Sequence, residues 1–76
     1  MNSINNIVKI GSIVYTEKNN TKYKFIIVNE NPDPLSGRIT QTSPVGSSLL
    51  GKKENDIIKV TTEIGIIEYK IYKIKN

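Results

Sequence analysis

The chain has no cysteine and no histidine, and both absences narrow what it can do. Without cysteine there is neither a disulfide nor a thiolate metal site. Without histidine the chain lacks the commonest metal ligand and the commonest general base. Its serines therefore have no histidine to activate them, and no histidine-based nucleophilic site is predicted.

Long apolar segments are missing too. No apolar run approaches the roughly 20 residues that a membrane-spanning helix needs. The N-terminal residues 1–6, MNSINN, are polar and lack the apolar core of a signal peptide. We therefore expect a cytoplasmic protein that does not associate with a membrane.

Carboxylates are the remaining candidates for catalysis. The seven are Glu17, Glu30, Asp33, Glu54, Asp56, Glu63 and Glu68. Most fall in predicted turns or on predicted solvent faces, and no two have the spacing of an acid–base pair or of a calcium loop. The segment 46–53, GSSLLGKK, is not a phosphate-binding loop, because its glycine spacing is wrong and no Ser or Thr follows Gly-Lys. We predict no catalytic, cofactor or metal site, and no enzyme.

Positive charge is in excess, with 11 Lys and Arg against 7 Asp and Glu and a formal net charge of +4. A basic domain can meet nucleic acid, an anionic membrane or an acidic protein face. The lysines are spread along the whole chain, which is typical of a solvated β-surface. Tyrosines among the lysines could also stack bases, so a single-stranded nucleic-acid-binding domain stays an alternative. These tyrosines are Tyr15, Tyr23, Tyr69 and Tyr72.

With 76 residues the chain holds one domain at most, and its many isoleucines favour strands. Strands are expected at residues 12–16, 21–28, 38–42, 57–62 and 66–74. In the second of these, Tyr23, Phe25 and Ile27 share one face while Lys22 and Lys24 point the other way. This alternation predicts a sheet with one wet side.

One helix is expected, from Pro44 to Leu50. Ser43 suits the N-cap position because its hydroxyl can accept an orphan backbone N–H, and Pro44 suits the first helical position because it has no N–H to lose. Gly51 can adopt the left-handed conformation that ends a helix. The preceding loop, residues 29–37, is stiffened by two prolines and is either a recognition surface or a plain connector.

Several short motifs in a fixed order relate the chain to a known family. They are Asp33-Pro34, Gly37-Arg38-Ile39, Ser43-Pro44-Val45-Gly46 and Leu49-Leu50-Gly51-Lys52-Lys53, flanked by Gly11-Ser12 and Glu68-Tyr69. From about Ile7 to its C-terminus the chain resembles the C-terminal domain of the bacterial Gre transcript-cleavage factors, GreA and GreB. It departs from the family at Ser47, where arginine is frequent, and at Ile64-Gly65, where two glycines are usual.

The resemblance implies an α+β, FKBP-like fold, in which a curved antiparallel β-sheet of about five strands carries one short α-helix. It also implies a short N-terminal tail, residues 1–6, followed by a single domain, residues 7–76. The coiled-coil N-terminal domain of the family is expected to be absent, because six residues are far too few for one.

The resemblance further implies a module that binds bacterial RNA polymerase at the rim helices of its largest subunit, near the secondary channel. Such a module would not stimulate transcript cleavage on its own. It would be a monomer without a cofactor and would meet nucleic acid only through the polymerase. The contact residues carried over from the family are Asp33, Pro34, Ser43, Pro44 and Val45.

The FKBP-like fold also suggests a peptidyl-prolyl isomerase as the weakest alternative. A fold does not carry function by itself, so this alternative rests on analogy. An isomerase of this type needs an apolar pocket lined by aromatic residues, and the chain has only Phe25 and four tyrosines to build one.

Overall fold

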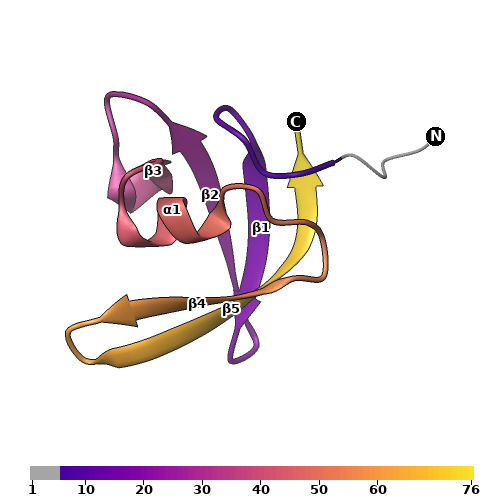
Figure 1. Ribbon diagram of the computed structural model, residues 1–76, viewed down its shortest axis with the longest axis vertical. Coiled ribbons are helices and arrows are strands. Elements are labelled where there is room, and N and C mark those ends of the chain that lie inside the picture. Colours follow the sequence, from indigo (N-terminus) through magenta and orange to yellow (C-terminus); the bar gives the residue numbers. More distant parts are fainter. Residues whose placement is uncertain (1–5) are drawn as a thin grey trace.

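A computed structural model provides the structure of the protein, which is described here for residues 6–76. Five strands form one sheet in the order β3-β2-β1-β5-β4. The elements are β1 (Ile13–Lys18), β2 (Thr21–Val28), the 3₁₀ helix η1 (Pro34–Ser36), β3 (Arg38–Thr40), α1 (Pro44–Leu49), β4 (Ile57–Thr62) and β5 (Gly65–Lys75). Figure 1 shows the sheet curling strongly, with α1 beside β3 and above the β4–β5 hairpin. The α+β, FKBP-like fold is thus confirmed.

Asparagine and glycine make the two hairpins possible. β1 and β2 pair antiparallel from Lys18 and Thr21, with Asn19 at φ 52° and Asn20 at φ 65° between them. Because asparagine tolerates positive φ, the sequence Asn19-Asn20 predicts a tight turn, and a two-residue turn forms there. At the other hairpin, Ile64 disfavours the positive φ of a tight two-residue turn, so the sequence predicts a three-residue turn that includes Gly65. Gly65, at φ 129°, instead pairs directly with Thr62, so the loop has two residues.

The strand β3 differs from the expected antiparallel pattern, because it runs parallel to β2. The chain reaches it through the 29–37 loop, which closes beside β2 at Gly37. The φ of Gly37 is 88°, and a Cβ there would lie 2.3 Å from the carbonyl oxygen of Lys24, so only glycine allows this approach. The strand ends at Thr40 rather than Thr42, since the Thr40 carbonyl turns the chain by accepting the Ser43 amide at 3.1 Å.

A β-bulge interrupts the long strand β5. The β1 partners of Ile71 and Lys73 are consecutive residues, which leaves Tyr72 as the extra residue between them. The bulge shifts the alternation of β5 by one residue, so Ile71 and Ile74 both point inward and are buried. Strict alternation along β5 would instead have brought Lys73 to the inner face.

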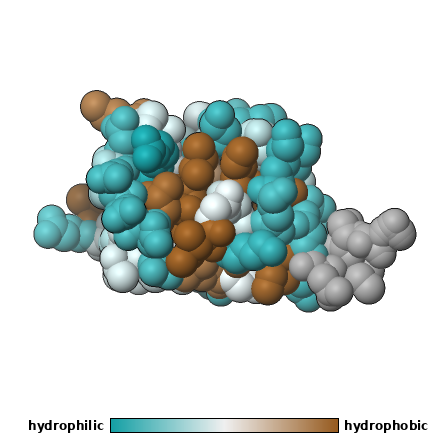
Figure 2. Space-filling view, turned by 90° about the horizontal axis from the view of Figure 1, so that it is seen from above, coloured by the Kyte–Doolittle hydropathy of each residue, from teal (hydrophilic) through white to brown (hydrophobic). Residues whose placement is uncertain are grey.

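One apolar core lies between the sheet and α1. It consists of Val8, Val14, Ile27, Ile39, Leu49, Ile58, Val60, Ile71 and Ile74. Seen from above, hydrophobic atoms gather in the middle of the surface and hydrophilic atoms border them (Figure 2). Within residues 6–76 no helix has the length and apolar character that crossing a membrane requires.

The residues before β1 are held to the rest of the domain. The Val8 amide donates to the Lys52 carbonyl at 2.9 Å, and the Gly51 amide donates to the Val8 carbonyl at 2.9 Å. Asn6, the last residue of the expected tail, donates from its side chain to the Ile74 carbonyl at 3.0 Å. Residues 1–5 of that tail lie outside the described part of the chain.

Candidate partner-binding site

The start of α1 has the predicted capping arrangement. Ser43 is extended, with φ −71° and ψ 159°, and its hydroxyl oxygen accepts the Gly46 amide at 3.1 Å. The same hydroxyl donates to the Thr40 carbonyl at 2.8 Å. Pro44 follows at the first helical position, as expected. The last helical residue is Leu49, and Gly51, at φ 80°, ends the turn that follows.

The side chains of the first helical turn differ in exposure. Pro44 is exposed, whereas Val45 is half-buried and packs against the core. Gly46 is buried, and a Cβ there would lie 2.0 Å from the Thr40 carbonyl oxygen. Of the three family residues at the helix start, Pro44 is therefore the exposed one, while Ser43 and Val45 fix the helix in place.

The loop that contains Asp33 and Pro34, the other two predicted contact residues, is closed by backbone hydrogen bonds. The Asp33 amide donates to the Arg38 carbonyl at 2.8 Å, and the Arg38 amide donates to the Asp33 carbonyl at 3.0 Å. Pro34 opens the helix η1 between them, followed by a fully exposed Leu35. The Asp33 carboxylate makes no capping bond and is exposed. An acidic and an apolar side chain are thus presented on a fixed backbone.

The predicted residues form two groups at the two ends of β3. Asp33 and Pro34 precede this strand, whereas Ser43, Pro44 and Val45 follow it. The strand has only three residues, which at about 3.3 Å each separates its ends by roughly 10 Å. Figure 1 shows η1 and α1 on the same side of the molecule, next to β3. Both groups are close enough to meet one partner surface.

A groove of about 680 Å³ adjoins the start of the helix, where Pro44 faces the β4–β5 hairpin. Its lining residues are Pro44, Thr61, Thr62, Glu63, Ile64 and Ile67. Ile64, at the hairpin tip, is 91% exposed. Neither Ile64 nor Ile67 was predicted to belong to the site, although an isoleucine in a tight turn is unusual and could have pointed to this place. None of the lining residues is aromatic, unlike the pocket that an isomerase needs.

The four tyrosines divide between the two faces of the sheet. On the inner face Tyr69 meets Tyr23 and Phe25 edge to face, with ring centroids 5.6 and 5.7 Å apart. Burial, and secondly the neighbouring Tyr23, raise the pKa of the Tyr69 phenol above its usual value. Tyr15 and Tyr72 lie together on the outer face, 6.1 Å apart. In the first group Phe25 and Tyr69 pack against the core while Tyr23 is exposed at its edge. In the second group Tyr72 is exposed and Tyr15 is half-buried.

The carboxylates do not assemble into a metal site. Within residues 6–76 there is no group of three or more histidine, cysteine, aspartate or glutamate residues that could hold an ion. Glu54 and Asp56 instead accept backbone amides, from Ile74 at 3.0 Å and from Lys53 at 2.8 Å. These two carboxylates therefore stabilise the turn before β4.

Comparison with known proteins identifies the class of the chain. The family described as "Transcription elongation factor, GreA/GreB, C-term" matches residues 3–76. The chain belongs to this family and corresponds to its C-terminal domain. The resemblance to the C-terminal domain of the Gre factors is thus confirmed.

Individual relatives give the same result. The chain is 40% identical over 63 residues to the transcription elongation factor GreA of Thermoanaerobacter pseudethanolicus, covering 82% of this chain and 40% of the relative. It is 39% identical over 71 residues to GreA of Clostridium botulinum (strain Langeland), covering 90% of this chain and 44% of the relative. The chain therefore spans less than half the length of these curated relatives.

A solved structure shares the fold. GreA factor homolog 1 of Thermus thermophilus superposes with a TM-score of 0.81 and 24% sequence identity, over 92% of this chain and 49% of that one. At this identity the likeness concerns the fold alone.

Proposed function

We propose that this chain is the RNA polymerase-binding module of a GreA/GreB-type elongation factor. The observation that carries the proposal is the family membership over residues 3–76, since the matched relatives are named transcription elongation factors. We place the contact at the rim helices of the largest polymerase subunit, near the secondary channel. The module acts there as an anchor or as a competitor, as a monomer in the cytoplasm.

The geometry of the first helical turn supports this docking surface. Pro44 is exposed and rigid, and it borders the groove next to the exposed Ile64. Rigid apolar side chains at the edge of a groove make good contacts, because little conformational entropy is lost when they are covered. The Asp33 carboxylate adds a negative charge at the other end of β3, where it can pair with a basic residue of the polymerase.

Ile64 distinguishes this chain from the usual family pattern of two glycines at the hairpin tip. A side chain that is 91% exposed there adds apolar surface to one wall of the groove. We expect Ile64 to tune how tightly the module holds its partner. The contact residues of the proposed docking surface are thus Asp33, Pro34, Pro44 and Ile64, held in place by Ser43 and Val45.

Direct binding tests the proposal. Core RNA polymerase from a Clostridium species is immobilised, and the chain is titrated over it by biolayer interferometry. We expect saturable binding that a full-length GreA of the same species displaces. A folded chain, verified by circular dichroism, that shows no saturable binding would contradict the proposed function.

A further inference from the structure

Five lysines lie together on the outer face of the sheet, which α1 does not cover. Lys22 and Lys24 are on β2, opposite Glu17 and Tyr15 of β1, and the remaining three lysines are on the half of β5 that pairs with β1. We call this set of outward side chains the basic platform. It consists of Tyr15, Glu17, Lys22, Lys24, Lys70, Tyr72, Lys73 and Lys75.

The charge of the chain is concentrated on this platform. Five lysines and one carboxylate give it a net charge of +4, the same as the formal net charge of the whole chain. All five lysines are exposed. The lysines are spread evenly along the sequence, but the charge is distributed unevenly in space, because the outward positions of neighbouring strands bring five of the lysines together.

Two aromatic rings lie among these lysines. The rings of Tyr15 and Tyr72 are 6.1 Å apart and inclined by 46°. The ammonium group of Lys22 lies 4.9 Å from the Tyr72 ring centroid, and that of Lys73 lies 5.8 Å from the Tyr15 centroid. Tyr72 remains 38% exposed. The platform thus combines accessible ring surface with cations around it.

The bulge in β5 produces this combination. Because Tyr72 is an extra residue, both Tyr72 and Lys73 point outward, although neighbours in a regular strand point to opposite faces. Bulges often re-aim a side chain in this way next to a functional site. Without the bulge, the ring of Tyr72 and the cation of Lys73 would not share a face.

We propose that the basic platform binds single-stranded RNA. Lysines supply the phosphate contacts that dominate affinity for nucleic acids, and aromatic rings on an open surface stack unpaired bases of any sequence. A sheet face is suited to unpaired bases, whereas a duplex hides its bases from such a surface. RNA is the single strand that is made during transcription elongation, the process named for this family.

Other anionic partners fit the platform less well. Lysine is depleted from protein–protein interfaces, so an acidic protein is not the favoured occupant of a surface with five lysines. A membrane-binding surface needs apolar side chains that insert between lipids. The platform contains no aliphatic side chain; Ile13 and Ile26 on the same face are half-buried, and the exposed Ile57 lies at its edge, opposite Lys70. The proposal goes beyond polymerase docking, and its site lies on the face of the sheet opposite α1.

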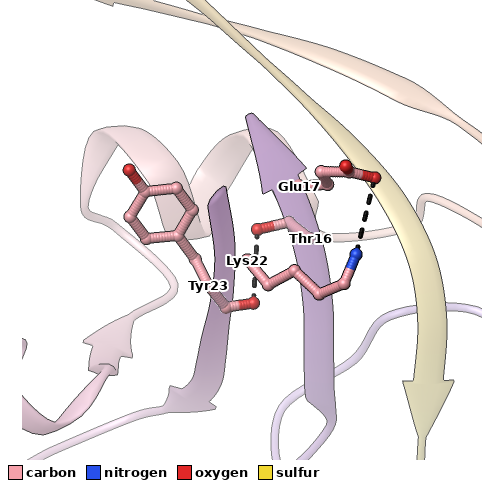
Figure 3. Close-up of polar contacts among 4 residues, drawn as sticks. All are labelled: Thr16, Glu17, Lys22 and Tyr23. Atoms are coloured by element: carbon pink, nitrogen blue, oxygen red, sulfur yellow. Dashed lines mark hydrogen bonds and ion pairs between the residues drawn. The ribbon is translucent and has the colours of Figure 1, made fainter. Parts of the chain in front are cut away.

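Within the basic platform, Glu17 is the carboxylate that would oppose a bound strand. Glu17 lies 3.9 Å from Lys22 as an exposed ion pair, with side-chain exposures of 37% and 62%. Figure 3 shows Lys22 and Glu17 extending toward each other across the two strands, while the Tyr23 ring points the other way. Removing this carboxylate frees Lys22 and should strengthen RNA binding.

The test is fluorescence anisotropy with a labelled oligouridine, without polymerase, over a series of salt concentrations. The parent chain should bind with an affinity that falls steeply with salt, by about 0.7 in the logarithmic slope for each phosphate contact. Lys24→Gln with Lys73→Gln should weaken binding by at least fivefold and lower that slope. Lys9→Gln with Lys53→Gln, which removes two charges outside the platform, is the matched control and should weaken binding by less than twofold.

Ring and carboxylate variants separate stacking from charge. Tyr72→Ser should weaken binding about fivefold or more, Tyr72→Phe should retain it, and Glu17→Gln should strengthen it about twofold. Circular dichroism verifies that each variant is folded. The proposal would be overturned if both lysine double variants lost the same affinity for oligouridine, or if Tyr72→Ser bound it like the parent. It would also be overturned if the parent bound duplex RNA or oligoglutamate as tightly as oligouridine, or preferred oligothymidine tenfold. Polymerase binding is measured separately, so the two proposals can fail independently.

Discussion

The Ser43 hydroxyl donates a 2.8 Å hydrogen bond to the carbonyl of Thr40, which joins the start of α1 to the end of β3. The same oxygen accepts the Gly46 amide at 3.1 Å, so one side chain both caps the helix and ties it to the sheet. The orientation of Pro44 and of the adjoining groove depends on this link.

Ser43→Ala should lower the free energy of unfolding by about 0.5–2 kcal/mol, because the cap and the link to Thr40 are both lost. Urea denaturation at neutral pH measures the change. Ser47→Ala is the matched control, since the Ser47 hydroxyl is exposed and bonds only the Pro44 carbonyl at 3.2 Å within the same helix. We expect a change below about 0.5 kcal/mol for Ser47→Ala. Equal effects of the two substitutions would contradict this role of Ser43.

Gly46→Ala should destabilise the domain although alanine favours helices. Its new Cβ would lie 2.0 Å from the backbone oxygen of Thr40, so α1 would have to move away from β3. Overpacking of this kind typically costs 1–3 kcal/mol. The same urea experiment tests the expectation, and a Gly46→Ala variant as stable as the parent would show that the helix can shift without loss.

Tyr69 should make stability depend on pH in the alkaline range. Burial, followed by the neighbouring Tyr23, raises the pKa of the folded phenol above the unfolded value of 10.0. As pH rises, the unfolded chain therefore loses this proton first. The contribution of Tyr69 to stability should be fully present below about pH 10 and should decline as pH rises toward the folded pKa.

Urea midpoints between about pH 8 and pH 11 test this expectation. Tyr69→Phe should flatten the decline, because phenylalanine has no proton to lose. Tyr72→Phe removes a phenol from the outer face instead and should leave the decline in place. If the Tyr69→Phe variant lost stability as steeply as the parent, the Tyr69 phenol would not be the cause of the decline.

Transcript cleavage provides a further prediction. The carboxylates of the described residues are dispersed, and no three of them gather where they could hold a metal ion. We therefore expect that this chain, added alone to backtracked elongation complexes, leaves the RNA at its full length. A full-length GreA is the positive control on the same complexes. Shortened RNA in the presence of the chain alone would contradict the expectation.

The sequence predicted most of the fold, since local rules and tertiary structure agree along most of the chain. β2 and β4 have the expected bounds, and Asn19, Ser43 and Pro44 occupy the predicted positions. The parallel pairing of β3 was not predictable, because it depends on how the 29–37 loop crosses to β2. The bulge at Tyr72 was missed for a similar reason, as strict alternation is the simplest assumption for a strand.

The candidate sites were harder to predict than the elements. Pro44 and Asp33 came from family motifs, whereas Ile64 joins Pro44 only because the hairpin folds back beside the helix. The clustering of the lysines was hidden in the same way, since Lys22 and Lys73 are far apart in sequence and share a face only because β2 and β5 both pair with β1. Residue types can be read from a sequence, but their gathering on one face depends on register.

The affinity of two variants for RNA polymerase tests the proposed docking surface most directly. Pro44→Asn and Asp33→Asn should each weaken binding by about fivefold or more, the loss expected when an interface contact worth more than 1 kcal/mol is removed. Their unfolding free energies should stay within about 0.5 kcal/mol of the parent. Glu30→Gln is the control for Asp33→Asn, because it removes the same charge at an exposed position of the same loop, and it should bind like the parent. If both variants bind core polymerase as tightly as the parent chain, this surface is not where the module docks.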